Sequence, residues 1–217
     1  MARERGRPRA FDIDHALDRA MEVFWKHGYQ DASLQELTDA MGLSKPSLYA
    51  AFGDKEALYL KGLQRYLALL IERHAGKLNG EPDGRTALKG FLFSLAGMLA
   101  DPELPGGCFI INGTADCGGS TIPASVEMAL REALQGTETM VLERLKRAAN
   151  DGQLPAGMTP QAMAALFGSL IAGLGVLAKS GAGLAKLTTV VETAMAVWPP
   201  NGAAAAHQGS SGRFATA

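Results

Sequence analysis

The chain has 217 residues and a formal net charge of −1, and 47% of its residues are hydrophobic. This length and apolar content allow a small domain and a larger second one, each with its own core. A charge this close to zero excludes diffuse affinity for nucleic acid over the whole surface, so any contact with DNA must come from a local basic cluster.

The sequence begins with a basic segment, RERGRPR, which contains Gly and Pro and has no apolar periodicity. Its arginines are Arg3, Arg5, Arg7 and Arg9. Such a segment predicts a flexible cationic arm that can enter a minor groove or follow phosphates. The residues after it carry aspartates at 12, 14 and 18 instead of a continuous apolar run, so we expect no signal peptide and a cytoplasmic location.

A first helix is predicted from Asp12 to His27, because apolar residues recur there at helical spacing. Its apolar stripe consists of Ile13, Ala16, Leu17, Ala20, Met21 and Phe24. We expect the next two helices to pack on this stripe and to form a three-helix core with it.

Ser33 to Lys55 predicts two short helices joined by a tight turn. Ser33 and Glu36 form a capping box, in which the hydroxyl and the carboxylate each satisfy a free amide at the helix start. Gly42 suits the end of that helix, and Ser44 can cap the next one. This geometry is typical of a helix-turn-helix, although any small helical hairpin has the same spacing.

The second helix of this pair separates an inner face from an outer one. Leu48 and Phe52 are expected to point inward, while the outward residues are Lys45, Ser47, Tyr49 and Ala50. Pro46 fits the first turn, where no amide partner is needed. Small and polar groups in the first half of such a helix are typical of a surface that meets bases or phosphates.

The rest of the chain predicts helices only. Their expected spans are 54–77, 86–100, 108–115, 122–149, 160–179 and 183–198, and the tail 199–217 is expected to be disordered. We therefore predict an all-α protein in which a three-helix head precedes a larger helical domain.

The uncharged run 161–178 reaches the lower length limit of a membrane span. We favour a buried helix, because its Ala, Gly and Ser content is only mildly hydrophobic. The residues expected to face inward are Leu166, Phe167, Leu170 and Leu174, and those of a small-residue face are Ala165, Ser169, Ala172 and Val176. That second face predicts close approach of a partner helix.

Motifs for enzymatic chemistry are absent from the sequence. It has no P-loop, no dinucleotide fingerprint and no metal-ligand spacing, so we expect no enzyme, no cofactor and no metal centre. The histidines are scattered at 15, 27, 74 and 207, and we interpret them as solvated or helix-terminal. Cys108 and Cys117 leave open a sensor of oxidants, electrophiles or a soft metal, although a Cys in an apolar run is usually a small core residue.

The segment from Gly28 to Leu58 resembles the DNA-binding domain of the TetR family of bacterial regulators. The likeness includes the sequence SLYAAFGDKEAL and covers the first quarter to third of the chain. It implies phosphate contacts from Tyr49 and Lys55, and positions nearest the bases for Lys45, Pro46, Ser47 and Ala50. The full expected DNA-binding set is Arg5, Arg7, Arg9, Ser33, Lys45, Pro46, Ser47, Tyr49, Ala50 and Lys55.

The resemblance further implies a homodimer formed through the last two helices, a palindromic operator of double-stranded DNA, and a small-molecule inducer. A Gly-Gly-Cys sequence at Cys108 is similar to that of a subset of the family, beside the ligand pocket. Candidate ligand contacts are Phe91, Leu95, Met98, Cys108, Phe109, Asn112, Met128, Met140, Met163 and Phe167. These implications predict domains at 1–55 and 56–198 and a repressor, with an activator or a vestigial helix-turn-helix as alternatives.

Overall fold

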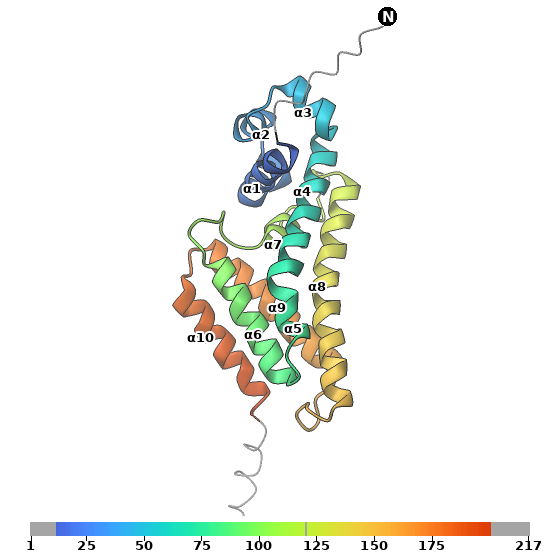
Figure 1. Ribbon diagram of the computed structural model, residues 1–217, viewed down its shortest axis with the longest axis vertical. Coiled ribbons are helices and arrows are strands. Elements are labelled where there is room, and N and C mark those ends of the chain that lie inside the picture. Colours follow the sequence, from blue (N-terminus) through green and yellow to red (C-terminus); the bar gives the residue numbers. More distant parts are fainter. Residues whose placement is uncertain (1–11, 120, 201–217) are drawn as a thin grey trace, which may run out of the picture. The chain divides into compact units, whose positions relative to one another are not determined.

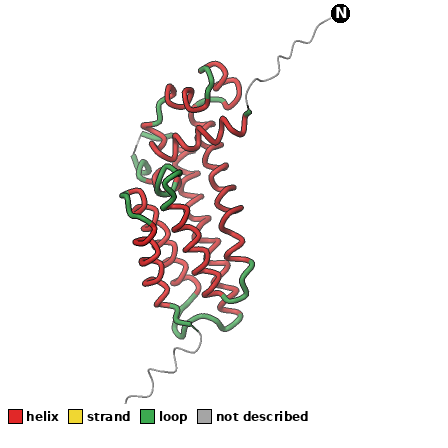
Figure 2. The backbone as a smooth tube through the Cα atoms, turned by 60° about the vertical axis from the view of Figure 1, so that its left-hand side comes forward, coloured by secondary structure: helices red, strands yellow, loops and turns green. Residues whose placement is uncertain are grey.

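The computed structural model describes residues 12–119 and 121–200, and in these ranges it contains helices and loops but no strand (Figure 2). The elements are α1 (Ile13–Asp31), α2 (Leu34–Met41), α3 (Lys45–Phe52), α4 (Lys55–Leu70), η1 (Ile71–Ala75, a π-helical turn), α5 (Gly76–Asn79), α6 (Gly84–Leu99), α7 (Phe109–Thr114), α8 (Ala124–Asn150), α9 (Pro160–Lys179), α10 (Leu184–Ala194) and η2 (Met195–Val197, a 3-10 turn). The predicted fold class, a helix-turn-helix head followed by a helical domain, is confirmed.

The chain forms two compact units, which we describe separately. The first contains the chain up to Arg73 together with Asp101–Gln135, and the second contains His74–Ala100 and the chain from Gly136 onward. Helix α4 and helix α7 thus belong to the same unit as the predicted head. The domain limits expected from the sequence, 1–55 and 56–198, stay a prediction.

In the first unit, α1, α2 and α3 lie together beside the first turns of α4 (Figure 1). The caps form as the sequence predicts. The Ser33 hydroxyl accepts from the Glu36 amide at 3.1 Å, and the Glu36 carboxylate accepts from the Ser33 amide at 2.9 Å. Gly42 ends α2 in the left-handed region, with φ 64°, which a side chain would disfavour. Ser44 then caps α3.

Helix α1 is interrupted near its end by Gly28, whose φ of 75° and ψ of −173° lie outside the helical region. The predicted end of this helix at His27 therefore coincides with a real break. The core of the unit is aromatic. Phe24 and Tyr59 meet edge to face at 4.9 Å between ring centroids, and Trp25 and Tyr66 do so at 4.8 Å.

Helices α6, α9 and α10 pack against one another in the second unit (Figure 1). A polar cluster closes one end of their core. The Trp198 indole donates to the Gln153 carbonyl at 3.0 Å, and the side chain of Gln153 accepts from the Gly84 amide at 2.7 Å. The buried Arg144 guanidinium donates to the carbonyls of Glu81 and Pro82, both at 3.0 Å.

Three sequence predictions are wrong in detail. The helix expected over 54–77 is not continuous, because η1 interrupts it at Ile71–Ala75. Leu166, expected to face inward on α9 with Phe167 and Leu174, is exposed, whereas those two residues and Met163 are buried. His74, expected to be solvated or at a helix end, is buried.

Candidate nucleic-acid interface and effector region

Helix α3 presents its first half to solvent. Lys45, Pro46, Tyr49 and Ala50 are exposed, and the Tyr49 side chain is 45% accessible. On the other side of the helix, Leu48 and Phe52 lie in the core of the first unit. The buried pair fixes the helix, so the outward groups form a preformed surface that a groove of DNA can accept.

Two serines of the predicted DNA-binding set take part in helix capping: Ser33 is the cap of α2, and Ser47 contacts Ser44, the cap of α3. The Ser33 hydroxyl is held in the capping box described above. The Ser47 hydroxyl lies 2.9 Å from the Ser44 hydroxyl, which also accepts from the Ser47 amide at 3.3 Å. A hydroxyl can donate and accept, so Ser47 keeps capacity for a further partner. Arg5, Arg7 and Arg9 lie outside the described residues.

Lys55 opens α4 next to this surface. Its ammonium donates to the Gln30 carbonyl at 3.2 Å and lies 4.8 Å from the centroid of the Tyr29 ring. Partial burial lowers the pKa of Lys55 from its ordinary value, while Asp31 and Glu36 oppose this shift. The ammonium has three donors, so one bond to a carbonyl leaves others for a phosphate. The contacts of Lys55 with Tyr29 and Gln30 were not predicted, because they join residues about 25 positions apart that share no local pattern.

Helix α7 and the glycines before it dock onto α1. The Trp25 indole donates to the Gly107 carbonyl at 3.1 Å. The Asn112 amide donates to the carbonyl of Trp25 at 3.1 Å and to that of Gly106 at 3.2 Å. Both of these bonds go to backbone carbonyls, and the expected role of Asn112 at a ligand stays a prediction. Gly106 and Gly107 have φ of 81° and 68°, so the turn that makes these contacts requires glycine.

The two cysteines are both partly buried and form no disulfide. The Tyr66 hydroxyl donates to the Cys108 sulfur at 3.3 Å, and burial raises the pKa of Cys108 above its ordinary value. Burial also raises the pKa of Cys117, and Glu127 adds to the effect. Only the thiolate attacks electrophiles or binds metals readily. Among the described residues, no group of three or more His, Cys, Asp or Glu side chains is arranged to hold a metal ion.

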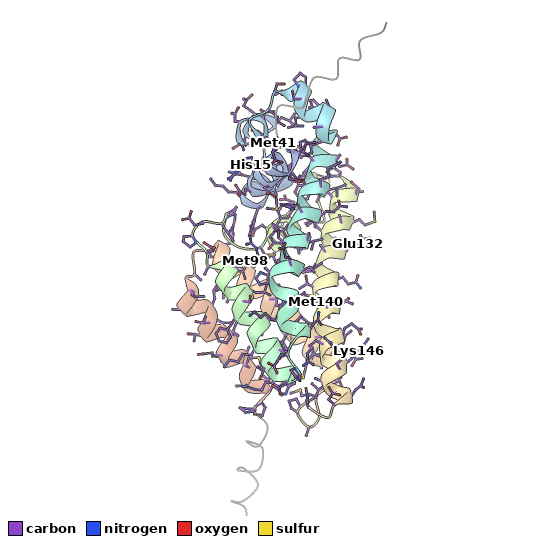
Figure 3. The ribbon with its side chains drawn as sticks, viewed as in Figure 1. His15, Met41, Met98, Glu132, Met140 and Lys146 are labelled. Atoms are coloured by element: carbon purple, nitrogen blue, oxygen red, sulfur yellow. The ribbon has the colours of Figure 1, made fainter. Side chains whose placement is uncertain are left out.

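The predicted ligand contacts are divided between the two units. Phe91, Leu95, Met163 and Phe167 are buried in the second unit. Met98 on α6 and Met140 on α8 are partly buried there (Figure 3). Cys108, Phe109 and Asn112 belong to the first unit, as does Met128, which is 59% exposed. Of the ten candidates, four are therefore buried in the second unit, two on α6 and two on α9.

Comparison with known families gives matches over both predicted parts of the chain. The model for bacterial regulatory proteins of the tetR family matches residues 16–61. The model for the tetracyclin repressor-like C-terminal domain matches residues 84–196, just over half of the chain. Both describe regulators and not enzymes. The second match includes α9, which by length and composition alone could also cross a membrane.

Similar proteins cover nearly the whole chain. HTH-type transcriptional repressor ComR of Escherichia coli (strain K12) is 32% identical over 91% of this chain and 93% of its own length. The uncharacterized HTH-type transcriptional regulator YezE of Bacillus subtilis (strain 168) is 30% identical over 88% and 98%. A solved structure of the TetR family regulator CifR, a cysteine mutant complexed with 26 bp double-strand operator DNA, is 37% identical, with a TM-score of 0.83 over 89% of this chain and 100% of CifR.

Proposed function

We propose that this chain, which belongs to the tetR family of bacterial regulatory proteins, is a homodimeric repressor that binds a palindromic operator and releases it when a small molecule binds. The observation that carries the proposal is the exposed first half of α3, fixed by the buried Leu48 and Phe52. The name of the similar ComR, a transcriptional repressor, supports repression over activation.

In this proposal the residues of α3 and its neighbours have distinct roles. Lys45, Pro46, Ser47 and Ala50 lie nearest the bases, because they begin the exposed helix. Tyr49 and Lys55 contact phosphates and set the register of the head on the duplex. Ser33 holds the start of α2, and the arginines of the N-terminal arm add sequence-independent affinity.

Dimerisation is proposed through α9 and α10. Only 28% of the 18-residue apolar stretch of α9 is buried within the chain. Leu166 and Val176 are exposed on α9, and Leu184 is exposed on α10. A second copy that covers these side chains removes an apolar surface from water. By two-fold symmetry it also supplies a second α3, about 34 Å from the first on one face of the duplex.

The effector is proposed to be a small and largely apolar molecule, bound among the C-terminal helices. Support comes from the buried set Phe91, Leu95, Met163 and Phe167. We also place the chain in the subset of the family with a Gly-Gly-Cys motif, assign 1–55 to DNA binding and 56–198 to effector binding and dimerisation, and expect a cytoplasmic protein without a membrane span.

Two alternatives make different predictions. An activator of the same architecture would bind the same DNA but would raise the expression of a reporter gene. A thiol or metal sensor would need Cys108 or Cys117, and it is disfavoured because burial raises the pKa of both thiols. Replacement of both cysteines by serine abolishes the effector response in that alternative and leaves it intact in our proposal.

The testing experiment measures binding to duplexes tiled across the DNA upstream of the chain's own gene, at several salt concentrations. Lys55→Ala is expected to weaken binding to all duplexes alike. It should also reduce the slope of the logarithm of the binding constant against the logarithm of the salt concentration by about one, because one phosphate contact is lost. Lys45→Ala is expected to change the preference among duplexes. Equal effects of the two variants on every duplex would contradict the roles assigned to them. Failure of the unmodified protein to bind any duplex at low salt would indicate a vestigial helix-turn-helix.

A further inference from the structure

The π-helical turn η1 interrupts the run of helix between Lys55 and Asn79, at the boundary between the two units. A π-turn is rare, occurs mostly as a single turn inside an α-helix, and is frequent at functional sites. The residues of η1, IERHA, include neither Gly nor Pro. Local sequence therefore does not disfavour an ordinary α-helix here, which directs attention to the tertiary contacts of the turn.

His74 makes such contacts with α6. It is 4% exposed and is the buried side chain of the turn, whereas Ile71 in the same turn is 62% exposed. Its Nδ1 lies 2.8 Å from the Ser94 hydroxyl, and its Nε2 lies 3.4 Å from the Met98 sulfur. Ser94 and Met98 are one turn apart on α6, so the imidazole spans a single turn of the neighbouring helix within the second unit.

The chemistry of Ser94 and Met98 determines which nitrogen of the His74 ring carries the hydrogen. A thioether sulfur only accepts, so the Nε2 atom that faces Met98 carries the hydrogen. In the neutral ring, Nδ1 then accepts from the Ser94 hydroxyl. Both polar atoms of a buried side chain are therefore engaged, and loss of either partner leaves a desolvated nitrogen. The two contacts can form together only when Nδ1 faces Ser94 and Nε2 faces Met98, so they select one orientation of the His74 ring.

The orientation of His74 and the π-turn depend on each other. A π-turn holds about one residue more than an α-turn, and one residue corresponds to about 100° of rotation about a helix axis. If η1 relaxed to an α-helix, its residues would change register and the imidazole would turn away from Ser94. The residues before the turn, which lead back along α4, would rotate relative to those after it.

We propose that the contact of His74 with Ser94 and Met98 is a latch that keeps η1 in its π form, and that an effector bound beside α6 opens it. This inference rests on the proposed function. Leu95 and Phe91, two of the buried candidates for effector contact, lie on the same helix as Ser94. Opening lets η1 relax to an α-helix and turns α4, which carries Lys55 at its start. His74 is a positioning residue that acts on DNA binding through the helix.

Hydrogen–deuterium exchange on the full-length protein tests the latch without an effector. In Ser94→Ala and His74→Leu, the amides of 71–79 are expected to exchange about three- to tenfold faster than in the unmodified protein, because one or two hydrogen bonds are lost. His74→Asn keeps a polar atom near the position of Nδ1 and is expected to restore most of the protection. Arg73→Ala, in the same turn but exposed, is the matched control and should leave the exchange unchanged.

Binding to upstream DNA is measured on the same variants. Ser94→Ala and His74→Leu are expected to bind about three- to tenfold more weakly, while Arg73→Ala and His74→Asn stay close to the unmodified protein. Unchanged exchange over 71–79 in Ser94→Ala and His74→Leu, or an equal effect of Arg73→Ala, overturns the latch. Faster exchange with unaltered DNA affinity overturns its control of DNA binding. If the unmodified protein binds no upstream DNA, the proposed function fails, and the exchange data still decide whether the latch exists.

Discussion

Two glycines of α6 lead to opposite predictions for the same substitution. A Cβ at Gly84 would lie 2.6 Å from the Ala148 Cβ, 2.9 Å from the Trp198 ring and 2.9 Å from the Gln153 side-chain oxygen. Ala148 and Trp198 are buried, and the Gln153 oxygen already accepts from the Gly84 amide. The neighbours cannot withdraw without breaking the polar cluster at this end of the second unit. A Cβ at Gly90 meets no atom within 4 Å.

The magnitudes follow from these distances. Overpacking of a close-packed core costs about 1–3 kcal/mol, so Gly84→Ala should destabilise the fold by that amount. At about 2–4 °C per kcal/mol for a chain of this size, its Tm should fall by about 2–12 °C. Gly90→Ala lies inside the helix and has free space. It should stabilise the fold by about 0.5–1 kcal/mol, because alanine loses less backbone entropy on folding.

Urea and thermal unfolding followed by circular dichroism, at one fixed protein concentration, measure both variants. The concentration is fixed because a dimer makes the apparent stability depend on it. Opposite signs of the two shifts are the expected result. If both substitutions change the stability in the same direction and by similar amounts, the close packing of Gly84 against Trp198 is wrong.

Three further outcomes test other parts of the structure. Ser33→Ala should reduce the unfolding free energy by about 1 kcal/mol at neutral pH. The Ser33 amide and then its hydroxyl lower the pKa of Glu36, and alanine keeps the amide; only the share of the hydroxyl is lost as the pH falls through that lowered value, so the deficit of Ser33→Ala should shrink only slightly in acid. Asn112→Leu removes two bonds to carbonyls and should cost about 1–3 kcal/mol in chemical unfolding, whereas a loss below about 0.3 kcal/mol would contradict the docking of α7 on α1. In Cys117→Ser, the remaining Cys108 should react with Ellman's reagent more slowly than a free thiol at neutral pH, because burial raises its pKa; a rate equal to that of the free thiol would refute its burial.

Local signals in the sequence were sufficient for the head. The capping box of Ser33 and Glu36, the left-handed end at Gly42 and the cap at Ser44 all form as predicted, because each involves residues within one helical turn. The inward positions of Leu48 and Phe52 followed from helical spacing alone. The DNA-binding assignment gained its specificity from the family resemblance, since hairpin geometry is common to many helical proteins.

The features that the sequence could not predict depend on contacts between distant residues. The π-turn requires His74 to meet Ser94 and Met98, and neither the turn nor its partners have a local pattern. Asn112 donates to the carbonyl of Trp25, which lies far away in the sequence, and no local pattern indicates this bond. Leu166 was expected to be buried but is exposed. In a helix that is apolar on all sides, the spacing of residues identifies two faces but does not indicate which face packs against the rest of the chain.

The central claim is that the exposed first half of α3 binds DNA, and a matched pair of charge substitutions tests it most directly. Ala50→Glu and Gln64→Glu each add one negative charge at an exposed position of the first unit, the former on α3 and the latter on α4. Fluorescence anisotropy with the best-bound upstream duplex should show at least about tenfold weaker binding for Ala50→Glu, at an unchanged Tm, and at most about a twofold change for Gln64→Glu. Equal affinity of the two variants would contradict the account.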